Sequence, residues 1–176
     1  MVQKNVPITT LQNPDLNIEG EWTKKFEKKV GLKVNIMQDM CQAFDNKDIH
    51  ILTVARPEHW HMLSTIWVCQ AFKVVYVEKP ASHNIWEGRK MVEATYKYDH
   101  IIQQGIQLHS SVVIREAIQL LRDKYIGKVY LSRDSFFWKR ADMGNKQFEP
   151  APTGSDYDPW ASPASKSLFI KNHSPL

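Results

Sequence analysis

The chain has 176 residues, a mass of 20.5 kDa and a formal net charge of +4, with 43% hydrophobic and 24% charged residues. This composition is ordinary for a globular protein of one domain or a little more, and it excludes a mainly disordered, collagen-like or disulfide-dense chain. No apolar run approaches the roughly 18 residues that would span a membrane. We therefore expect no membrane partner.

The basic residues are spread along the chain rather than gathered in one run. Nucleic-acid binding needs basic residues on one face together with aromatic residues for stacking. The densest basic group alternates with glutamates, a pattern typical of a solvated helix face; it comprises Lys24, Lys25, Lys28 and Lys29, with Glu21 and Glu27 between or before them. Nucleic acid is therefore not expected as a partner.

Short β-branched or apolar runs alternate with amphipathic segments along the chain. The predicted strands are Val6–Leu11, Lys33–Met37, Ile49–Ala55, Val74–Val77, Ile101–Gln104 and Val129–Trp138. The predicted helices are Trp22–Val30 before Gly31, Asp39–Phe44, one after Pro57 that buries Met62, Ile66 and Cys69, one capped by Asn84 and Glu87, and one with Ile114, Ala117, Ile118 and Leu121 on one face that ends at Gly127. No further helix is expected after Gly127.

Apolar strands separated by helices indicate an α/β fold with a parallel sheet that is covered on both faces. Such sheets bind ligands beyond the carboxyl ends of their strands. After Gly127 one long strand leads into a proline-containing segment. The pattern therefore predicts a second unit that begins here and is not finished.

Three loops at predicted strand ends carry the candidate site residues. His59 and His61 stand two apart in the first loop, a spacing that points their rings to different sides of a helix, so no metal site is expected. In the second loop, Lys79 follows Glu78 directly. A lysine at a strand end can transfer a proton or hold a substrate hydroxyl. The alternative, which the residues alone favour slightly, is a surface ion pair before a proline that starts a helix. In the third, Gly105 permits close approach of a ligand.

The segment Val75–Ala94, VYVEKPASHNIWEGRKMVEA, is similar to the signature of the glucose–fructose oxidoreductase and inositol 2-dehydrogenase (Gfo/Idh/MocA) family, whose hallmark is Glu-Lys-Pro after an apolar strand. Further segments resemble that family along nearly the whole chain. They are HWH at His59–His61, GIQ at Gly105–Gln107, REAIQLLRD at Arg115–Asp123, IGKVYLSR at Ile126–Arg133 and DYDPWASPA at Asp156–Ala164.

The resemblance implies a partial NAD(P)-binding Rossmann domain, a doubly wound parallel sheet, over residues 1–127. Residues 128–176 would begin an α+β open-sheet domain for substrate and oligomerisation. The implied reaction moves a hydride between NAD or NADP and a hydroxyl-bearing carbon of a sugar or cyclitol. By resemblance, Lys79 is the catalytic residue that contacts the hydroxyl, and Glu78 and Pro80 line the nicotinamide. The other residues that it places at the cofactor are Asn13, Ala55, Arg56, Pro57, Glu58, His61, Gln107 and Trp160.

Several departures from the family pattern lead to a second hypothesis. No GxGxxG motif occurs, so the first strand and the turn that holds the pyrophosphate at a helix N-terminus are expected to be missing. The second domain's catalytic Asp and His are also expected to be missing. Arg56 and Glu58 replace a Thr and an Asn, and Asn13 stands in place of an acid. The chain is thus either a shortened oxidoreductase or a non-catalytic remnant that at most binds a nucleotide or a partner subunit.

The same departures bear on partners and location. A missing central strand would leave unpaired strand edges, which favour association between chains, so a homo-oligomer is open beside the sugar or polyol substrate. The N-terminal residues lack the apolar core of a secretory signal. The cytoplasm is therefore the default location, but the compartment is left open because the resemblance implies a shortened N-terminus.

Overall fold

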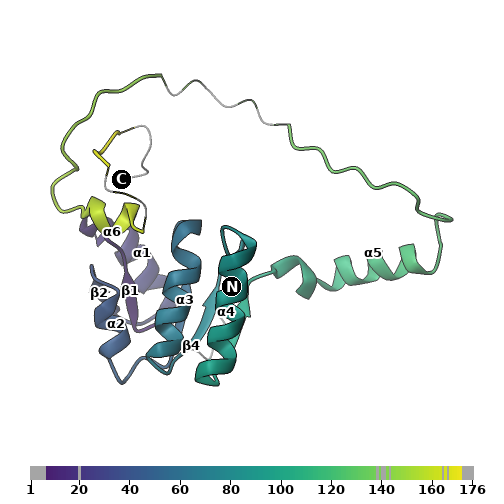
Figure 1. Cartoon of the computed structure of the whole chain (residues 1–176), viewed down its shortest axis with the longest axis horizontal. Coiled ribbons are helices and arrows are strands. Elements are labelled where there is room, and N and C mark those ends of the chain that lie inside the picture. The colour runs from purple at the N-terminus through teal and green to yellow at the C-terminus, as the bar shows by residue number, and fades with distance from the viewer. Residues whose placement is uncertain are drawn as a thin grey trace.

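Figure 1 shows the computed structural model of the chain, which describes residues 7–19, 21–137, 139, 142, 144–163, 165 and 167–171. Its strands are β1 Thr10–Gln12, β2 Asn35–Met37, β3 Ile51–Val54, β4 Val74–Val77 and β5 Ile102–Gln104. Its α-helices are α1 Glu21–Val30, α2 Cys41–Asp45, α3 His61–Gln70, α4 Ile85–Tyr98, α5 Val112–Arg122 and α6 Tyr157–Ala161. Short 3-10 helices are η1 Leu16–Glu19, η2 Glu58–Trp60 and η3 Gln107–Ser110. None of the described helices is long and apolar enough to cross a membrane.

The strands form two small parallel sheets, one of β1 and β2 and one of β3, β4 and β5 in that order. This confirms the predicted parallel α/β architecture, and each strand expected before Gly105 overlaps an observed one. Val6, the first residue of the first expected strand, lies outside the described residues. In a doubly wound sheet the first strand stands at the centre, next to strands 2 and 4. In this structure no described strand joins the two sheets.

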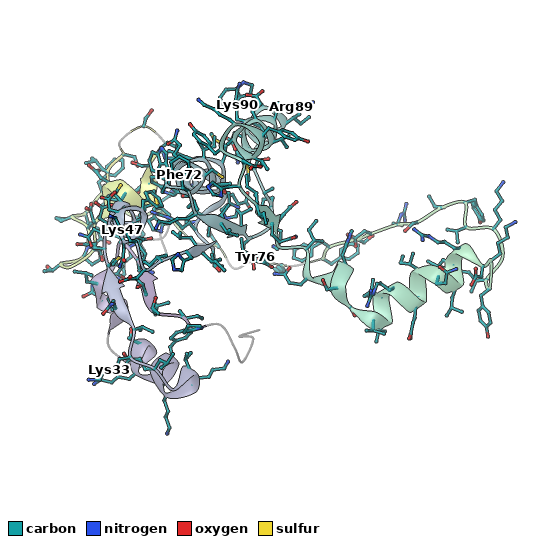
Figure 2. The ribbon with its side chains drawn as sticks, turned by 90° about the horizontal axis from the view of Figure 1, so that it is seen from below. Lys33, Lys47, Phe72, Tyr76, Arg89 and Lys90 are labelled. Carbon is teal, nitrogen blue, oxygen red and sulfur yellow. The ribbon has the colours of Figure 1, made fainter. Side chains whose placement is uncertain are left out.

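The main core lies between the three-stranded sheet and two helices. Figure 2, seen nearly along the strands, shows α3 and α4 on the same side of this sheet. Alternate strand residues point to this side, and the buried core consists of Val54, Val75 and Val77 from the strands, Val68 and Cys69 from α3, and Met91 from α4. Alternate residues of the apolar runs of β3 and β4 thus lie in the core, and the residues between them lie on the opposite side of the sheet.

The predicted buried face of α3 is partly wrong. Cys69 is buried, but Met62 and Ile66 are only partly buried. Residues on the sides of the expected stripe are buried instead, namely His61, Ser64, Thr65 and Val68. The reason is that α3 packs against both β4 and α4, so a wide arc of small and medium side chains is enclosed.

Local signals set several boundaries as predicted. Gly31, at φ +76°, ends α1 in the left-handed region that glycine tolerates. At the start of α4 the backbone N–H of Glu87 donates to Asn84 Oδ1 at 2.9 Å, and the N–H of His83 donates to the Glu87 carboxylate at 2.8 Å. The first bond is the predicted cap and satisfies a donor that the first turn of a helix leaves free, and the second ties Glu87 back to the residue before the cap.

The second half of the chain differs from expectation in three ways. Helix α5 ends at Arg122, several residues before Gly127, and none of its residues is buried. No strand occurs in the described part of Val129–Trp138, because a strand needs a neighbour and no described strand lies beside it; Trp138 itself lies outside the described residues. A further helix, α6, does follow Gly127. In Figure 1 α5 projects away from the body of the molecule, whereas α6 lies back near β1.

Removing the cap of α4 should weaken the fold by a predictable amount. We expect Asn84→Ala to lower the free energy of unfolding by about 1 kcal/mol, because the Glu87 N–H loses its acceptor. Urea denaturation followed by circular dichroism measures this change. His83→Ala is the control, since it removes an exposed side chain next to the cap, and an equal loss in both variants would contradict the assignment.

Candidate active site

The register of the three-stranded sheet brings the predicted loops to one edge. Val54 pairs with Val77, and Val77 pairs with Gln104. The ladder continues one step further, where the N–H of Glu78 donates to Val54 O at 2.9 Å and the N–H of Gly105 donates to Val77 O at 2.8 Å. The loops that begin at Ala55, Glu78 and Gly105 therefore leave the sheet side by side at what we call the carboxyl edge.

Two of these loops are joined directly by a side-chain pair. Gln107 Nε2 donates to both oxygens of the Glu78 carboxylate, at 2.9 and 3.1 Å. Lys79 is exposed, and within the described part of the chain its ammonium has no ion-pair partner. The alternative of a Glu78–Lys79 surface ion pair is therefore wrong. The Lys79–Pro80 peptide bond is cis.

The buried side chain of His61 links the loop after β3 to the loop after β4. Its side chain is 2% exposed, its Nε2 lies 2.8 Å from Arg56 O, and its Nδ1 makes a short contact with Pro80 O. His59 points elsewhere, because its Nε2 lies 3.2 Å from Trp160 O. The two histidines thus serve different contacts, and the described residues contain no cluster of three or more metal-ligating side chains.

Arg56 is the cation in the loop after β3. Its guanidinium donates to Met40 Sδ at 2.9 Å and to Pro159 O at 3.1 Å, and it lies 4.3 Å over the ring of Trp60. Burial lowers the pKa of Arg56 to about 10, against the opposing effect of the Asp39 charge. Arg56 is therefore committed to contacts within the chain, while Glu58, on η2, is exposed.

The segment of residues 154–160, which we call the strap, lies across the ends of both sheets. At β3 it accepts the bonds from Arg56 and His59 at Pro159 and Trp160. At β1 it forms a bridge between Asp15 and Ser155, and the N–H of Asp156 donates to Pro14 O at 2.9 Å. The strap thus brings Trp160 next to His59, in the loop after β3.

Asn13 lies at the end of β1 and stabilises the turn that leads to Asp15, the residue that contacts the strap. Its Oδ1 accepts from the N–H of Asp15 at 2.8 Å. The Asp15 carboxylate is 8% exposed and accepts from Asn17 Nδ2 and Ser155 Oγ, each at 2.8 Å. Sequence reasoning missed this polar cluster; the NPDLN turn at Asn13–Asn17 signals a side-chain-bonded turn, but its distant partner Ser155 has no local signal.

The family model described as "Oxidoreductase family, NAD-binding Rossmann fold" (Gfo/Idh/MocA) matches residues 16–106, a little over half of the chain. The chain belongs to this family. The match confirms the resemblance carried by the Glu78-Lys79-Pro80 signature, and it confirms the Rossmann fold of the parallel sheets.

Individual relatives agree in fold. Levoglucosan dehydrogenase of Pseudarthrobacter phenanthrenivorans is 23% identical over 124 residues, which are 70% of this chain and 30% of that protein. The structure of myo-inositol 2-dehydrogenase from Lactobacillus plantarum superposes with a TM-score of 0.59 at 22% identity, covering 70% of this chain and 35% of that one. WlbA dehydrogenase from Chromobacterium violaceum, in complex with NADH and UDP-GlcNAcA, gives 0.57 at 18% identity, covering 69% and 34%. The chain spans about a third of the length of these proteins.

The groups at the carboxyl edge can be tested against a nicotinamide dinucleotide, the cofactor of this family's fold. A nicotinamide amide and ribose hydroxyls pair with carboxylate, amide and carbonyl groups, which Glu78, Gln107 and the adjoining loops supply. A pyrophosphate needs the N–H groups of a Gly-rich turn at a helix N-terminus. The described residues contain no such turn, and Arg56 already donates to Pro159. The residues present fit the nicotinamide half of the dinucleotide.

Close packing at Gly105 gives a test of this edge. A Cβ there would overlap the Tyr76 hydroxyl and lie 2.8 Å from Tyr76 Cζ. We expect Gly105→Ala to lower the free energy of unfolding by about 2 kcal/mol through overpacking, and by under about 1 kcal/mol in a Tyr76→Leu background. Urea denaturation of the unmodified chain, the two single variants and the double variant measures both values.

The control is Gly88→Ala within α4, where a Cβ would meet Ser82 Oγ at 3.1 Å, the end of a small side chain. Alanine favours a helix over glycine by up to about 1 kcal/mol, so this variant should be neutral or more stable. A cost at Gly105 that is the same in both backgrounds would show that Tyr76 is not its cause.

Proposed function

We propose that this chain carries the nicotinamide half of an oxidoreductase site that moves a hydride between NAD or NADP and a hydroxyl-bearing carbon of a sugar or cyclitol. The observation that carries this proposal is the state of Lys79. Its ammonium is exposed at the end of β4 without an ion-pair partner among the described residues, while the neighbouring carboxylate of Glu78 is held by Gln107. A cation so placed is available to a ligand oxygen.

The names of the relatives support the substrate class. Levoglucosan and myo-inositol are a sugar derivative and a cyclitol, and the WlbA dehydrogenase structure holds a nucleotide sugar beside NADH. All three molecules offer secondary hydroxyls on a ring. A lysine ammonium binds such an oxygen through its three N–H donors.

In the proposed reaction Glu78, Pro80 and Gln107 would hold the nicotinamide, which would supply the acceptor or donor of the hydride. Lys79 Nζ holds the substrate oxygen and takes up the hydroxyl proton as the C–H bond breaks; in the reverse direction it gives the proton back. Gln107 keeps the Glu78 carboxylate turned toward it. This contact leaves Lys79 unpaired and so available to the substrate.

The remaining predicted residues take positions around this centre in the proposal. The loop after β3 consists of Ala55, Arg56, Pro57 and Glu58. His61 contacts both Arg56 O in this loop and Pro80 O, and so holds the loop next to Pro80. Trp160 reaches the edge from the strap, and Asn13 lies at the end of β1. We place the proposed domain boundary at Gly127. The residues before it form the cofactor side, and the residues after it include the strap and Trp160.

Cofactor binding is tested by titrating NAD, NADH, NADP and NADPH while following tryptophan fluorescence. Trp60 and Trp160 both lie near the carboxyl end of β3. Nicotinamide binding there should therefore change the tryptophan emission. We expect saturable binding that is weakened by Gln107→Ala and kept by Gln103→Ala, an exposed residue of β5. The absence of any change up to millimolar cofactor would contradict the proposal.

Catalysis is tested by following NAD(P)H absorbance with a panel that includes levoglucosan, myo-inositol and nucleotide sugars. Lys79→Ala should lower kcat by about 10²–10⁴-fold with cofactor binding unchanged. Lys33→Ala is the matched control, because Lys33 is an exposed lysine beyond α1 and lies far from β4 (Figure 2). Turnover that survives Lys79→Ala, or no turnover with any substrate despite cofactor binding, would refute the catalytic part of the proposal.

A further inference from the structure

One face of the β3-β4-β5 sheet is open. The residues that alternate with the buried row point to this face. Ile51 pairs with Val74, and Thr53 pairs with Tyr76, which in turn pairs with Gln103. Ile51 is 57% exposed, and Thr53 and Gln103 are exposed as well. In Figure 2 Tyr76 lies on the side of the sheet away from α3 and α4, where no described helix covers it. Parallel sheets are almost always covered on both faces.

Helix α5 carries the complementary surface. Ile114, Ala117, Ile118 and Leu121 follow the spacing i, i+3, i+4 and i+7 and form one apolar stripe. None of these side chains is buried, and Ile114 and Ile118 remain 41% and 43% exposed. The polar residues Arg115, Glu116 and Gln119 lie outside the stripe. A helix with such a stripe needs an apolar surface to pack against, because most helical stability in proteins comes from this packing.

The two surfaces match in size. An α-helix rises 1.5 Å per residue, so the 11 residues of α5 span about 16 Å. A parallel strand rises about 3.3 Å per residue, so the four residues of β3 or β4 span about 13 Å. Helix α5 is therefore long enough to cover the open face along its strands.

The linker between β5 and α5 holds the helix away from its own sheet. Within Gly105–Ser111, the N–H of His109 donates to Ile106 O and the N–H of Ser111 donates to Leu108 O, both at 3.1 Å. Ser111 then caps α5. Linker and helix thus form one hydrogen-bonded arm, and Figure 1 shows this arm extending outward from the body. An arm of this kind presents its stripe to another molecule.

We propose that α5 of one copy of this chain covers the open face of β3-β4-β5 in a second copy, and that the exchange is reciprocal. Each copy then offers one stripe and one open face, so the contact closes after two chains with two-fold symmetry, as exchanged elements do in other dimers. The occupant is a second copy because the same sequence supplies both surfaces and the arm points away from its own sheet.

The oligomeric state tests this proposal directly. Size-exclusion chromatography with light scattering should give a dimer for the unmodified chain. The double variant Ile114→Gln and Ile118→Gln should be monomeric or at least tenfold weaker in its dimer dissociation constant. The matched control is Arg115→Gln with Glu116→Gln, which makes the same kind of change outside the stripe at equal net charge and should stay dimeric.

A mixing experiment separates exchange from other modes of association. Ile51→Lys with Thr53→Lys changes only the open face and should also abolish the dimer. The helix variant keeps an intact open face and the sheet variant keeps an intact stripe, so an equimolar mixture should form a mixed dimer through one remaining contact. A mixed dimer supports the exchange even if either variant is less stable, and its absence overturns it.

Three other outcomes would overturn the proposal. The first is a monomer at every concentration, with α5 amides protected from hydrogen exchange, which would show that α5 folds back on its own sheet. The second is a dimer that the helix variant leaves intact. The third is an equal loss of the dimer in the helix variant and in its polar-face control.

Discussion

The pairing of β3 with β4 and β5 is the constraint on which the rest of the structure depends. Val54 and Val77 lie in one register row beneath α3 and α4, with Val68, Cys69 and Met91 packed against them. A shift of one residue would turn these valines to the open face and bring Thr53 and Tyr76 into the core. The apolar row therefore fixes the register, and the register sets where the loops begin. Glu78 and Gly105 meet at one edge because Val77 and Gln104, the residues before them, pair in the same register row.

The strap supplies the second constraint, because the β1-β2 sheet is small. Two-stranded units are marginal on their own and need further packing. Asp15, buried and bonded to Ser155, ties the end of β1 to the strap. Arg56 and His59 tie the end of β3 to the same segment. Residues far apart in sequence thus hold the two sheets in one arrangement.

Features encoded within a few residues were predictable from the sequence. The run Val74–Val77 is apolar throughout and bounded by charged residues, so its strand is observed as predicted. Asn84 and Glu87 form their cap because both partners belong to one helical turn. Lys79 reaches the edge for the same reason, since it directly follows this strand.

Features that depend on distant partners were not predictable in the same way. The buried face of α3 depends on the positions of β4 and α4, which periodicity alone does not contain. The strand expected from Val129 needs a neighbouring strand, and its β-branched and aromatic residues cannot supply one. Helix α6 was missed because its segment contains several prolines, although Pro159 lies in the first turn of the helix, where a proline is compatible with it. The Glu78–Gln107 pair joins two loops, so its residues could be named from the resemblance but their contact could not.

The linker to α5 connects the candidate site with the proposed interface. Gln107 is the first residue of η3, and η3 leads through Ser111 directly into α5. The same Gln107 side chain holds the carboxylate next to Lys79. Because η3 and α5 belong to one hydrogen-bonded arm, an α5 docked on a second copy would hold η3 in place. Docking would therefore reduce the freedom of Gln107 and, through it, of Glu78. The exchange thus links the covering of the open sheet face with the order of the groups around Lys79, because one short hydrogen-bonded segment belongs to both.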